Sequence, residues 1–344
     1  MTEITLKSEM RAAQIVSPKQ TRLHRLDVPR PGPDDVIIQV KRAGICGTDI
    51  HILHGEYSLA KFPMVPGHEF CGVVSAVGER VSRFKVGDSV TADPNIPCNR
   101  CPSCQRNEQN QCQRLEVVGV SRDGAFAEYV SVPEGVVFGI GDMNFAQGAL
   151  IEPLACVVWG LKQVQIQTGD NLLIFGAGPM GCLIMQAAKR AGATSVTMVD
   201  RAAWRLDVAK ELGADHVVSS DALGELRKIA AEGFEVVADA TGVPAVLEQC
   251  FDYVRARGKV WVFGVAPDHA KASFSPYQVF RKDLKIIGSF ALNKTFQESI
   301  NLIQSGAVKL EPLISHVLPI EDFEKGLELA EKDPKRMKVQ FSFD

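Results

Sequence analysis

The sequence lacks a strong excess of charge of either sign. Its 38 Lys and Arg residues stand against 41 Asp and Glu residues, so the formal net charge is only -3 in a chain of 344 residues. This balance gives no electrostatic basis for binding nucleic acid or an anionic membrane surface. We therefore expect a small-molecule substrate and no nucleic acid partner.

The sequence also lacks a long hydrophobic run. Residues 1–20 mix polar and apolar side chains, without the apolar stretch of a signal peptide. No stretch approaches the length of a membrane-spanning helix. We expect a cytoplasmic protein with no membrane partner. The chain length and its 46% hydrophobic residues predict two domains, each with enough material for a core.

Cysteine is plentiful and partly clustered. There are nine Cys residues, an odd number that cannot all pair within one chain. Four of them form the pattern Cys98-x2-Cys101-x2-Cys104-x7-Cys112. Four thiolates complete the tetrahedral shell of a zinc ion and leave no place for substrate, which predicts a structural zinc lobe at about residues 94–114. An iron–sulfur cluster or free loop cysteines are the alternatives.

A second group of polar residues lies earlier in the chain. Residues 46–51 contain a thiol, a hydroxyl, a carboxylate and an imidazole, and residues 66–69 end in His and Glu. Cys, His and Glu bind zinc through sulfur, nitrogen and oxygen. We hypothesise that Cys46, His68 and Glu69 meet on one catalytic zinc ion. The alternative is a buried structural Cys beside an unrelated surface His–Glu pair.

Short strand patterns separated by Gly and Pro continue to about residue 141, and no long amphipathic helix interrupts them. The clearest candidates are residues 36–40, 73–77, 88–91 and 128–132. Such patterns predict a mostly β first domain.

A glycine-rich turn opens the second half. Gly176-x-Gly178-x-x-Gly181 follows an apolar strand at 171–175 and precedes a helix at 182–191. In this context the glycines allow a tight turn, close approach of a pyrophosphate, and close packing of helix on strand. The motif predicts a dinucleotide site. A glycine-rich turn without a nucleotide is the alternative.

The choice of dinucleotide depends on the end of the next strand. Strand 195–199 is followed by Asp200, whose carboxylate would bind the ribose 2′-hydroxyl and repel a 2′-phosphate. We therefore favour NAD over NADP, with Arg201 and Arg205 close enough to weaken that preference.

Strands and helices then alternate to residue 288, which predicts a doubly wound parallel sheet with a ligand crevice just past its strand ends. The predicted cofactor contacts are Gly176, Gly178, Pro179, Met180, Gly181, Asp200, Arg201, Arg205, Thr241, Gly264, Ser289 and Phe290.

Together these motifs resemble the zinc-dependent medium-chain dehydrogenases. The resemblance implies an α/β protein with a GroES-like catalytic domain, residues 1–152 and 291–344, and a Rossmann NAD-binding domain, residues 153–290. Two zinc ions per chain, one catalytic and one structural, and NAD would be the cofactors.

Residues 150–155 resemble the polyol, sorbitol-like branch of that family. By this resemblance Glu152 reaches the catalytic zinc directly or through water, and Cys156 is a competing ligand that we interpret as a small buried residue. Sorbitol enzymes usually carry an Arg after the last Rossmann strand, and residues 288–293 contain none. Other pentitols, hexitols, sugar acids and sugar phosphates therefore remain open as substrates.

The resemblance also implies roles in proton transfer. Thr48 would take the substrate proton and His51 would pass it to solvent, because histidine titrates near neutrality. Asp49 either orients His68 or simply forms a turn. A homo-oligomer, more readily a tetramer than a dimer, is expected. The rival functions are a dehydrogenase of threonine or simple secondary alcohols, and a non-catalytic nucleotide-binding sensor.

Overall fold

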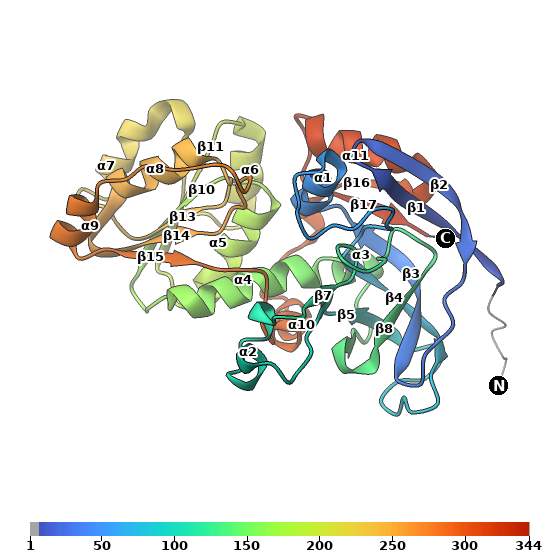
Figure 1. Ribbon diagram of the computed structural model, residues 1–344. Helices are drawn as coiled ribbons and strands as arrows, with labels where there is room; N and C mark the ends of the chain where they lie inside the picture. Colours follow the sequence, from blue (N-terminus) through green and yellow to red (C-terminus); the bar gives the residue numbers. More distant parts are fainter. Residues whose placement is uncertain (1–6, 344) are drawn as a thin grey trace. The chain divides into compact units, whose positions relative to one another are not determined.

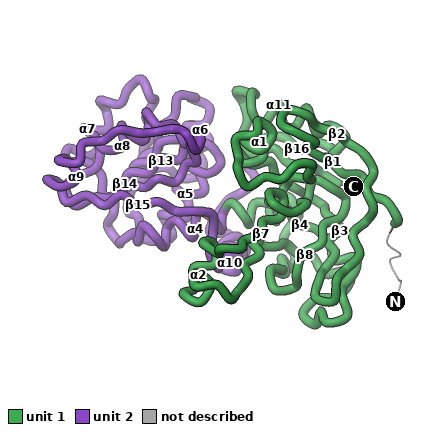
Figure 2. Tube along the Cα trace, viewed as in Figure 1, with its two compact units in different colours: residues 1–153, 313–344 green, residues 154–312 purple. Residues whose placement is uncertain are grey.

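The computed structural model describes residues 7–343 and divides the chain into two units (Figure 2). Unit 1 extends to Pro153 and resumes at Leu313, and unit 2 comprises Leu154–Pro312. In the described part of the chain, no helix has the length and apolar character needed to cross a membrane.

Unit 1 is built on a mostly antiparallel sheet (Figure 1). Its path is β16 (Ile314–Pro319), β17 (Lys338–Ser342), β3 (Asp35–Gly44), β4 (Glu69–Val77), β5 (Ser89–Ala92) and β9 (Val137–Gly139), with β8 (Tyr129–Pro133) also paired to β3. A hairpin of β1 (Glu9–Ser17) and β2 (Gln20–Asp27), the short pair β6 (Asn95–Ile96) and β7 (Glu116–Val117), and helices α1 (Gly47–His54), α2 (Pro102–Gln105), α3 (Phe145–Gly148) and α11 (Phe323–Lys332) complete it. The predicted mostly β architecture is confirmed.

The end of the chain is anchored in the core of unit 1. Phe126, Phe323 and Phe341 are buried together, and the ring centroids of Phe126 and Phe341 are 5.1 Å apart in an edge-on contact. Such aromatic pairs contribute about 0.5–1.5 kcal/mol beyond their buried area. Strand β17 is therefore held against β3 by packing as well as by backbone hydrogen bonds.

Unit 2 contains a six-stranded parallel sheet. Its order is β12 (His216–Ser219), β11 (Ser195–Asp200), β10 (Asn171–Phe175), β13 (Phe234–Asp239), β14 (Val254–Val262) and β15 (Lys285–Gly288). The helices are α4 (Ile151–Val164, which begins in unit 1), α5 (Pro179–Ala191), α6 (Ala203–Glu211), α7 (Leu226–Ile229), α8 (Pro244–Tyr253), α9 (Pro276–Lys282) and α10 (Phe296–Gln304). The first strand of the unit, β10, lies at the centre of the sheet. The next two strands follow on one side of it and the last three on the other, as in the Rossmann fold. The predicted fold class is confirmed.

The second boundary between the units differs from the predicted one. We expected the first domain to resume at residue 291, but it resumes at Leu313. The reason is α10, whose apolar side is buried at Phe296 and Ile300. The hydroxyl of Thr295, at its N-cap, donates to the carbonyl of Ala155 at 2.7 Å, which also ties the helix to unit 2.

Candidate metal centres and cofactor site

The ends of two neighbouring strands bring the first candidate metal centre together. The ligand atoms of Cys46, His68 and Glu69 lie within 4.8 Å of one another. Cys46 follows β3 and is the N-cap of α1, while Glu69 is the first residue of β4. Because Gly44 pairs with Glu69 in the β3–β4 ladder, the two polar groups must meet at this edge.

Gly44 makes room for the carboxylate. A Cβ atom at position 44 would overlap with Glu69 Oε2. Any larger residue here would have to displace the Glu69 carboxylate, so glycine is favoured by the space that this side chain occupies rather than by its backbone angles. The motif around Cys46 contains this residue, but its role becomes visible only in the paired strands.

Asp49 is buried beneath this centre. Its Oδ2 accepts the backbone N–H of Cys46 at 2.8 Å, and its Oδ1 lies 3.6 Å from Nδ1 of His68. Burial works to lower the pKa of His68, but the charges of Asp49 and Cys46 outweigh it and raise that pKa well above its ordinary value. Asp49 thus both fixes the turn at Cys46 and faces the imidazole, which joins the two roles considered for it.

The residues at this centre fit a zinc ion. Among the described residues, Glu69 Oε2 is a buried polar atom without a hydrogen-bond partner, while His68 Nδ1 faces Asp49 Oδ1 and so leaves the other ring nitrogen of His68 for a metal ion. Unsatisfied buried groups are rare in native proteins and indicate a missing partner. A thiol, an imidazole and a carboxylate are also the donor types that zinc binds.

Glu152 lies near this group without being part of it. It is buried in the first turn of α4, and its charge helps to raise the pKa of His68. Its carboxylate is not among the ligand atoms that cluster within 4.8 Å. The competing residue Cys156 belongs to unit 2, which begins at Leu154.

Thr48 and His51 lie on α1, directly beyond Cys46. The Oγ of Thr48 is 3.7 Å from the Sγ of Cys46. His51 is one helical turn further on, with Nδ1 3.0 Å from Glu56 Oε2 and its side chain partly exposed. One hydroxyl therefore faces the candidate centre while one imidazole reaches the surface.

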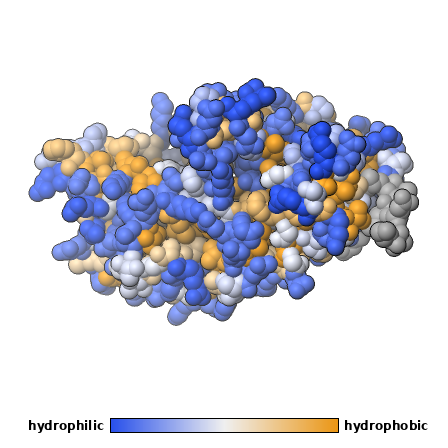
Figure 3. Space-filling model, turned by 90° about the horizontal axis from the view of Figure 1, so that it is seen from below, coloured by the Kyte–Doolittle hydropathy of each residue, from blue (hydrophilic) through white to orange (hydrophobic). Residues whose placement is uncertain are grey.

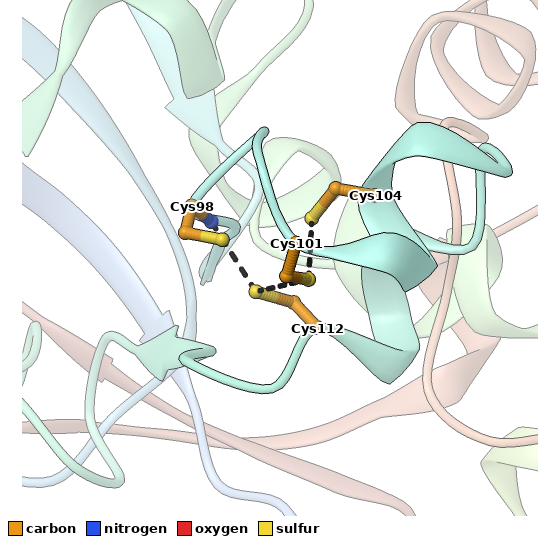
Figure 4. Close-up of side chains that lie close together, drawn as sticks. All are labelled: Cys98, Cys101, Cys104 and Cys112. Atoms are coloured by element: carbon orange, nitrogen blue, oxygen red, sulfur yellow. Dashed lines mark hydrogen bonds between the residues drawn. The ribbon is translucent and has the colours of Figure 1, made fainter.

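The four lobe cysteines form the second candidate metal centre. Their sulfur atoms lie within 4.8 Å of one another and point toward a common point (Figure 4). Ligands at the Zn–S distance of about 2.3 Å are about 3.8 Å apart in a tetrahedron, so the spacing fits zinc. The backbone N–H of Arg100 is the main cause that lowers the pKa of Cys98 to about 6, which favours the thiolate that binds metal.

The glycine-rich turn in unit 2 has the predicted geometry. Gly176 adopts φ +102°, a backbone conformation that favours glycine, and a Cβ atom on Gly181 would overlap with the carbonyl oxygen of Gly176. Gly178 is the N-cap of α5, followed by Pro179 at the first helical position. The turn therefore presents the N-terminus of a helix, where a pyrophosphate binds.

Asp200 and Arg205 lie beside this turn. The carboxylate of Asp200 accepts the backbone N–H of Ala177 at 2.8 Å and that of Ala202 at 2.9 Å. Arg205 Nη1 is 3.9 Å from Asp200 Oδ2, and its guanidinium lies over the ring of Trp204. A carboxylate and a cation thus both lie where the adenosine ribose would be recognised.

The remaining cofactor candidates separate into loop residues and a packing residue. Thr241 donates from its N–H and its hydroxyl to Asp239 Oδ1, at 2.8 and 2.6 Å. A Cβ atom on Gly264 would overlap with the backbone of Gly242, so the loops after β13 and β14 touch at the carboxyl ends of the strands. Ser289 accepts the indole N–H of Trp261 at 3.1 Å, a packing contact within unit 2. The positions of the others are as follows: Met180 in the first turn of α5, Arg201 and Phe290 exposed.

Two buried residues near the candidate sites were not among the predicted site residues. Lys338 pairs with Glu69 at 2.7 Å, and Asp239 fixes the loop that carries Thr241. Neither belongs to a recognisable motif, and the pairing of β17 with β3 joins positions about three hundred residues apart.

Both halves of the chain match known families. Residues 32–142 match the alcohol dehydrogenase GroES-like domain, and residues 179–305 match the zinc-binding dehydrogenases. The chain belongs to the zinc-dependent medium-chain dehydrogenases. The predicted family is confirmed.

Three relatives illustrate the family. The D-altritol 5-dehydrogenase of Agrobacterium fabrum is 39% identical over 97% of this chain and 99% of its own. An L-threonine 3-dehydrogenase of Rhizobium etli is 34% identical over 93% and 95%. The crystal structure of a zinc-binding dehydrogenase from Sinorhizobium meliloti 1021, bound to NADP, has a TM-score of 0.94 and 34% identity, with 98% and 100% coverage.

Proposed function

We propose that this protein is an NAD-dependent zinc dehydrogenase that oxidises a secondary alcohol of a polyol or sugar derivative. The observation that carries the proposal is the cluster of half-buried Cys46 with buried His68 and Glu69, and with buried Glu152 beside it. The resemblance of the Glu152 segment to polyol enzymes, and the 39% identity to a D-altritol 5-dehydrogenase, support the choice of substrate class.

The proposed mechanism assigns one task to each residue. When bound, zinc supplies Lewis-acid polarisation of the substrate hydroxyl and the nicotinamide supplies a hydride acceptor. Cys46, His68 and Glu69 would hold the metal, and Asp49 would keep the imidazole of His68 in its orientation. Glu152 would contribute negative charge at the same centre.

The proton would leave along α1. The Thr48 hydroxyl stands beside Cys46 and would accept the proton of the substrate hydroxyl while releasing its own proton toward His51. His51 would pass it on to solvent, because its ring is partly exposed and already paired with the Glu56 carboxylate.

The preference for NAD is testable at Asp200. Replacing Asp200 by Asn removes the charge that would repel a 2′-phosphate, while Arg205 remains. We expect the ratio of kcat/KM with NADP to that with NAD to rise about tenfold to a hundredfold, from like-charge repulsion of a few kcal/mol. Asp207→Asn on the exposed side of α6 is the matched control and should leave the ratio unchanged. An unchanged ratio in Asp200→Asn would show that this carboxylate does not choose the cofactor.

The function itself is tested by a substrate panel. Purified protein is incubated with NAD and, in turn, pentitols, hexitols, sugar acids, sugar phosphates, simple secondary alcohols and threonine, with and without a zinc chelator. We expect chelator-sensitive NADH formation with at least one polyol or sugar derivative. Turnover of threonine or simple alcohols alone would overturn the substrate class and keep the mechanism.

Threonine is the second candidate substrate. The observation in its favour is the 34% identity to an L-threonine 3-dehydrogenase over most of both chains. The same panel separates the two, since threonine offers an amino acid head group that a polyol lacks.

We also infer a homo-oligomer, specifically a tetramer, in the cytoplasm. Tyr277 and Phe280 of α9 are 70% and 80% exposed, and Ile286 lies on the edge strand β15. Exposed hydrophobic side chains beside an open sheet edge favour association. Figure 3 shows one face of the molecule, where patches of hydrophobic residues interrupt a mostly hydrophilic surface. None of the nine cysteines, all of which lie in the described residues, forms a disulfide bond, as expected in a reducing compartment.

A further inference from the structure

A buried lysine lies against the candidate catalytic centre. Lys338 is the first residue of β17, and its side chain is only 6% exposed. Its Nζ lies 2.7 Å from Glu69 Oε1 and 3.3 Å from the carbonyl oxygen of Ile45. Lysine is almost never fully buried unless it is paired, so this contact has to be explained.

The strand register brings Lys338 to this position. In the antiparallel pair of β17 and β3, Gln340 stands opposite Gly44. Continuing that register by two residues places Lys338 opposite Cys46, and the hydrogen bond from Ile45 N–H to Val339 O confirms that the strands stay together there. The last strand of the chain therefore runs along the loop that carries Cys46.

The two oxygen atoms of the Glu69 carboxylate have different surroundings. Its Oε1 accepts the Lys338 ammonium, whereas its Oε2 is buried without a hydrogen-bond partner in the space that Gly44 leaves free. One oxygen is thus fixed by the lysine, and the other remains available to a metal ion.

The negative charges at the centre explain how a lysine can be buried here. Glu69, Cys46 and Glu152 all act electrostatically on Lys338. Zinc carries two positive charges, and a thiolate with two carboxylates brings three negative ones. A buried excess of negative charge is costly, and a cation at 2.7 Å offsets it.

We propose that Lys338 is a positioning residue of the metal centre, which holds the Glu69 carboxylate in place. The proposal rests on the zinc site of the proposed function. Lys338 touches neither substrate nor cofactor in this scheme and acts through Glu69 alone. The C-terminal strand is therefore part of the metal site.

The test compares zinc affinity in matched variants. Lys338→Met keeps the length of the side chain and removes its charge. We expect the affinity of the catalytic site for zinc, measured by competition with a chromogenic chelator, to fall about tenfold to a hundredfold, as for other residues that support metal ligands. Lys335→Met, at an exposed lysine just before β17, is the control and should keep the parental affinity. Equal affinity in Lys338→Met and the parent would overturn the proposal.

The same substitution made in a Glu69→Gln variant distinguishes an effect of Lys338 on the position of Glu69 from a general effect on folding. In Glu69→Gln, Lys338→Met should cause no further loss of zinc affinity, because the group on which Lys338 acts is already neutral. This double variant buries no unpaired charge, so it also serves if Lys338→Met alone does not fold. An equal loss in both backgrounds would mean that Lys338 acts on structure in general and would overturn the proposal.

Metal binding is read here without turnover, so a failure of the polyol assay leaves this result intact. If the proposed zinc site does not exist, a Cys46 variant will have the same zinc content as the parent protein, and this result is separate from the affinity measurement on Lys338.

Discussion

Cys46→Ala is expected to remove the catalytic zinc and to lower kcat/KM by about a thousandfold or more, the scale on which loss of electrostatic stabilisation slows enzymes. Among Cys46, His68 and Glu69, the cysteine thiolate is the softest ligand and has the shortest side chain. Its position at the N-cap of α1 is fixed by the backbone there. Two ligands, His68 and Glu69, would remain, too few for a catalytic zinc site. Elemental analysis should give one zinc per chain instead of two.

The matched control is Cys156→Ala. Cys156 was the competing candidate ligand, and it lies in unit 2. We expect this variant to keep both zinc ions and most of the parental activity. Loss of one zinc in Cys156→Ala, with zinc retained in Cys46→Ala, would contradict the assigned ligand set.

The parts of the site that could be predicted are those whose residues lie close together in the sequence. The cysteine pattern from Cys98 to Cys112 and the turn from Gly176 to Gly181 each lie within one short, continuous segment of the sequence. Their chemistry therefore depends little on distant partners, and the structure places them as expected. The alternation of strands and helices in unit 2 was equally local, and it fixed the fold class.

The parts that could not be predicted depend on pairing between distant strands. Lys338 has no motif around it, and only the register of β17 on β3 brings it to Glu69. The space that Gly44 leaves for a carboxylate likewise exists only once β3 and β4 are paired. The boundary near α10 was misplaced because an amphipathic helix shows that it has a buried side, but not which domain covers it.

The zinc lobe, which together with the strand pair β6 and β7 spans residues 94–117, should depend on its metal for its folded state. Its buried cluster consists of Cys101, Cys104 and Cys112 with Cys98 and Leu115 packed against it. Apart from Leu115, the side chains that fill the cluster are the ligands themselves. In such small metal sites, binding energy is folding energy.

We therefore expect Cys104→Ser to lose one zinc per chain and to unfold this lobe locally. A loss of about 3 kcal/mol would lower Tm by about 6–12 °C for a domain of this size. Hydrogen exchange should rise in residues 94–117, while the strands β3 and β4 stay protected. Calorimetry and exchange mass spectrometry measure these effects. Arg100→Ala, at an exposed position between two lobe cysteines, is the control and should change neither zinc content nor exchange.

Comparison of the two cysteine variants tells the two zinc ions apart. Cys46→Ala should lose activity and keep the lobe protected, because its site lies at the ends of β3 and β4. Cys104→Ser should lose protection in the lobe and keep the set Cys46, His68 and Glu69 intact. If Cys104→Ser retained both zinc ions and normal exchange, the lobe cysteines would not be a structural zinc site, and the protected state of residues 94–117 would have to come from their backbone contacts alone.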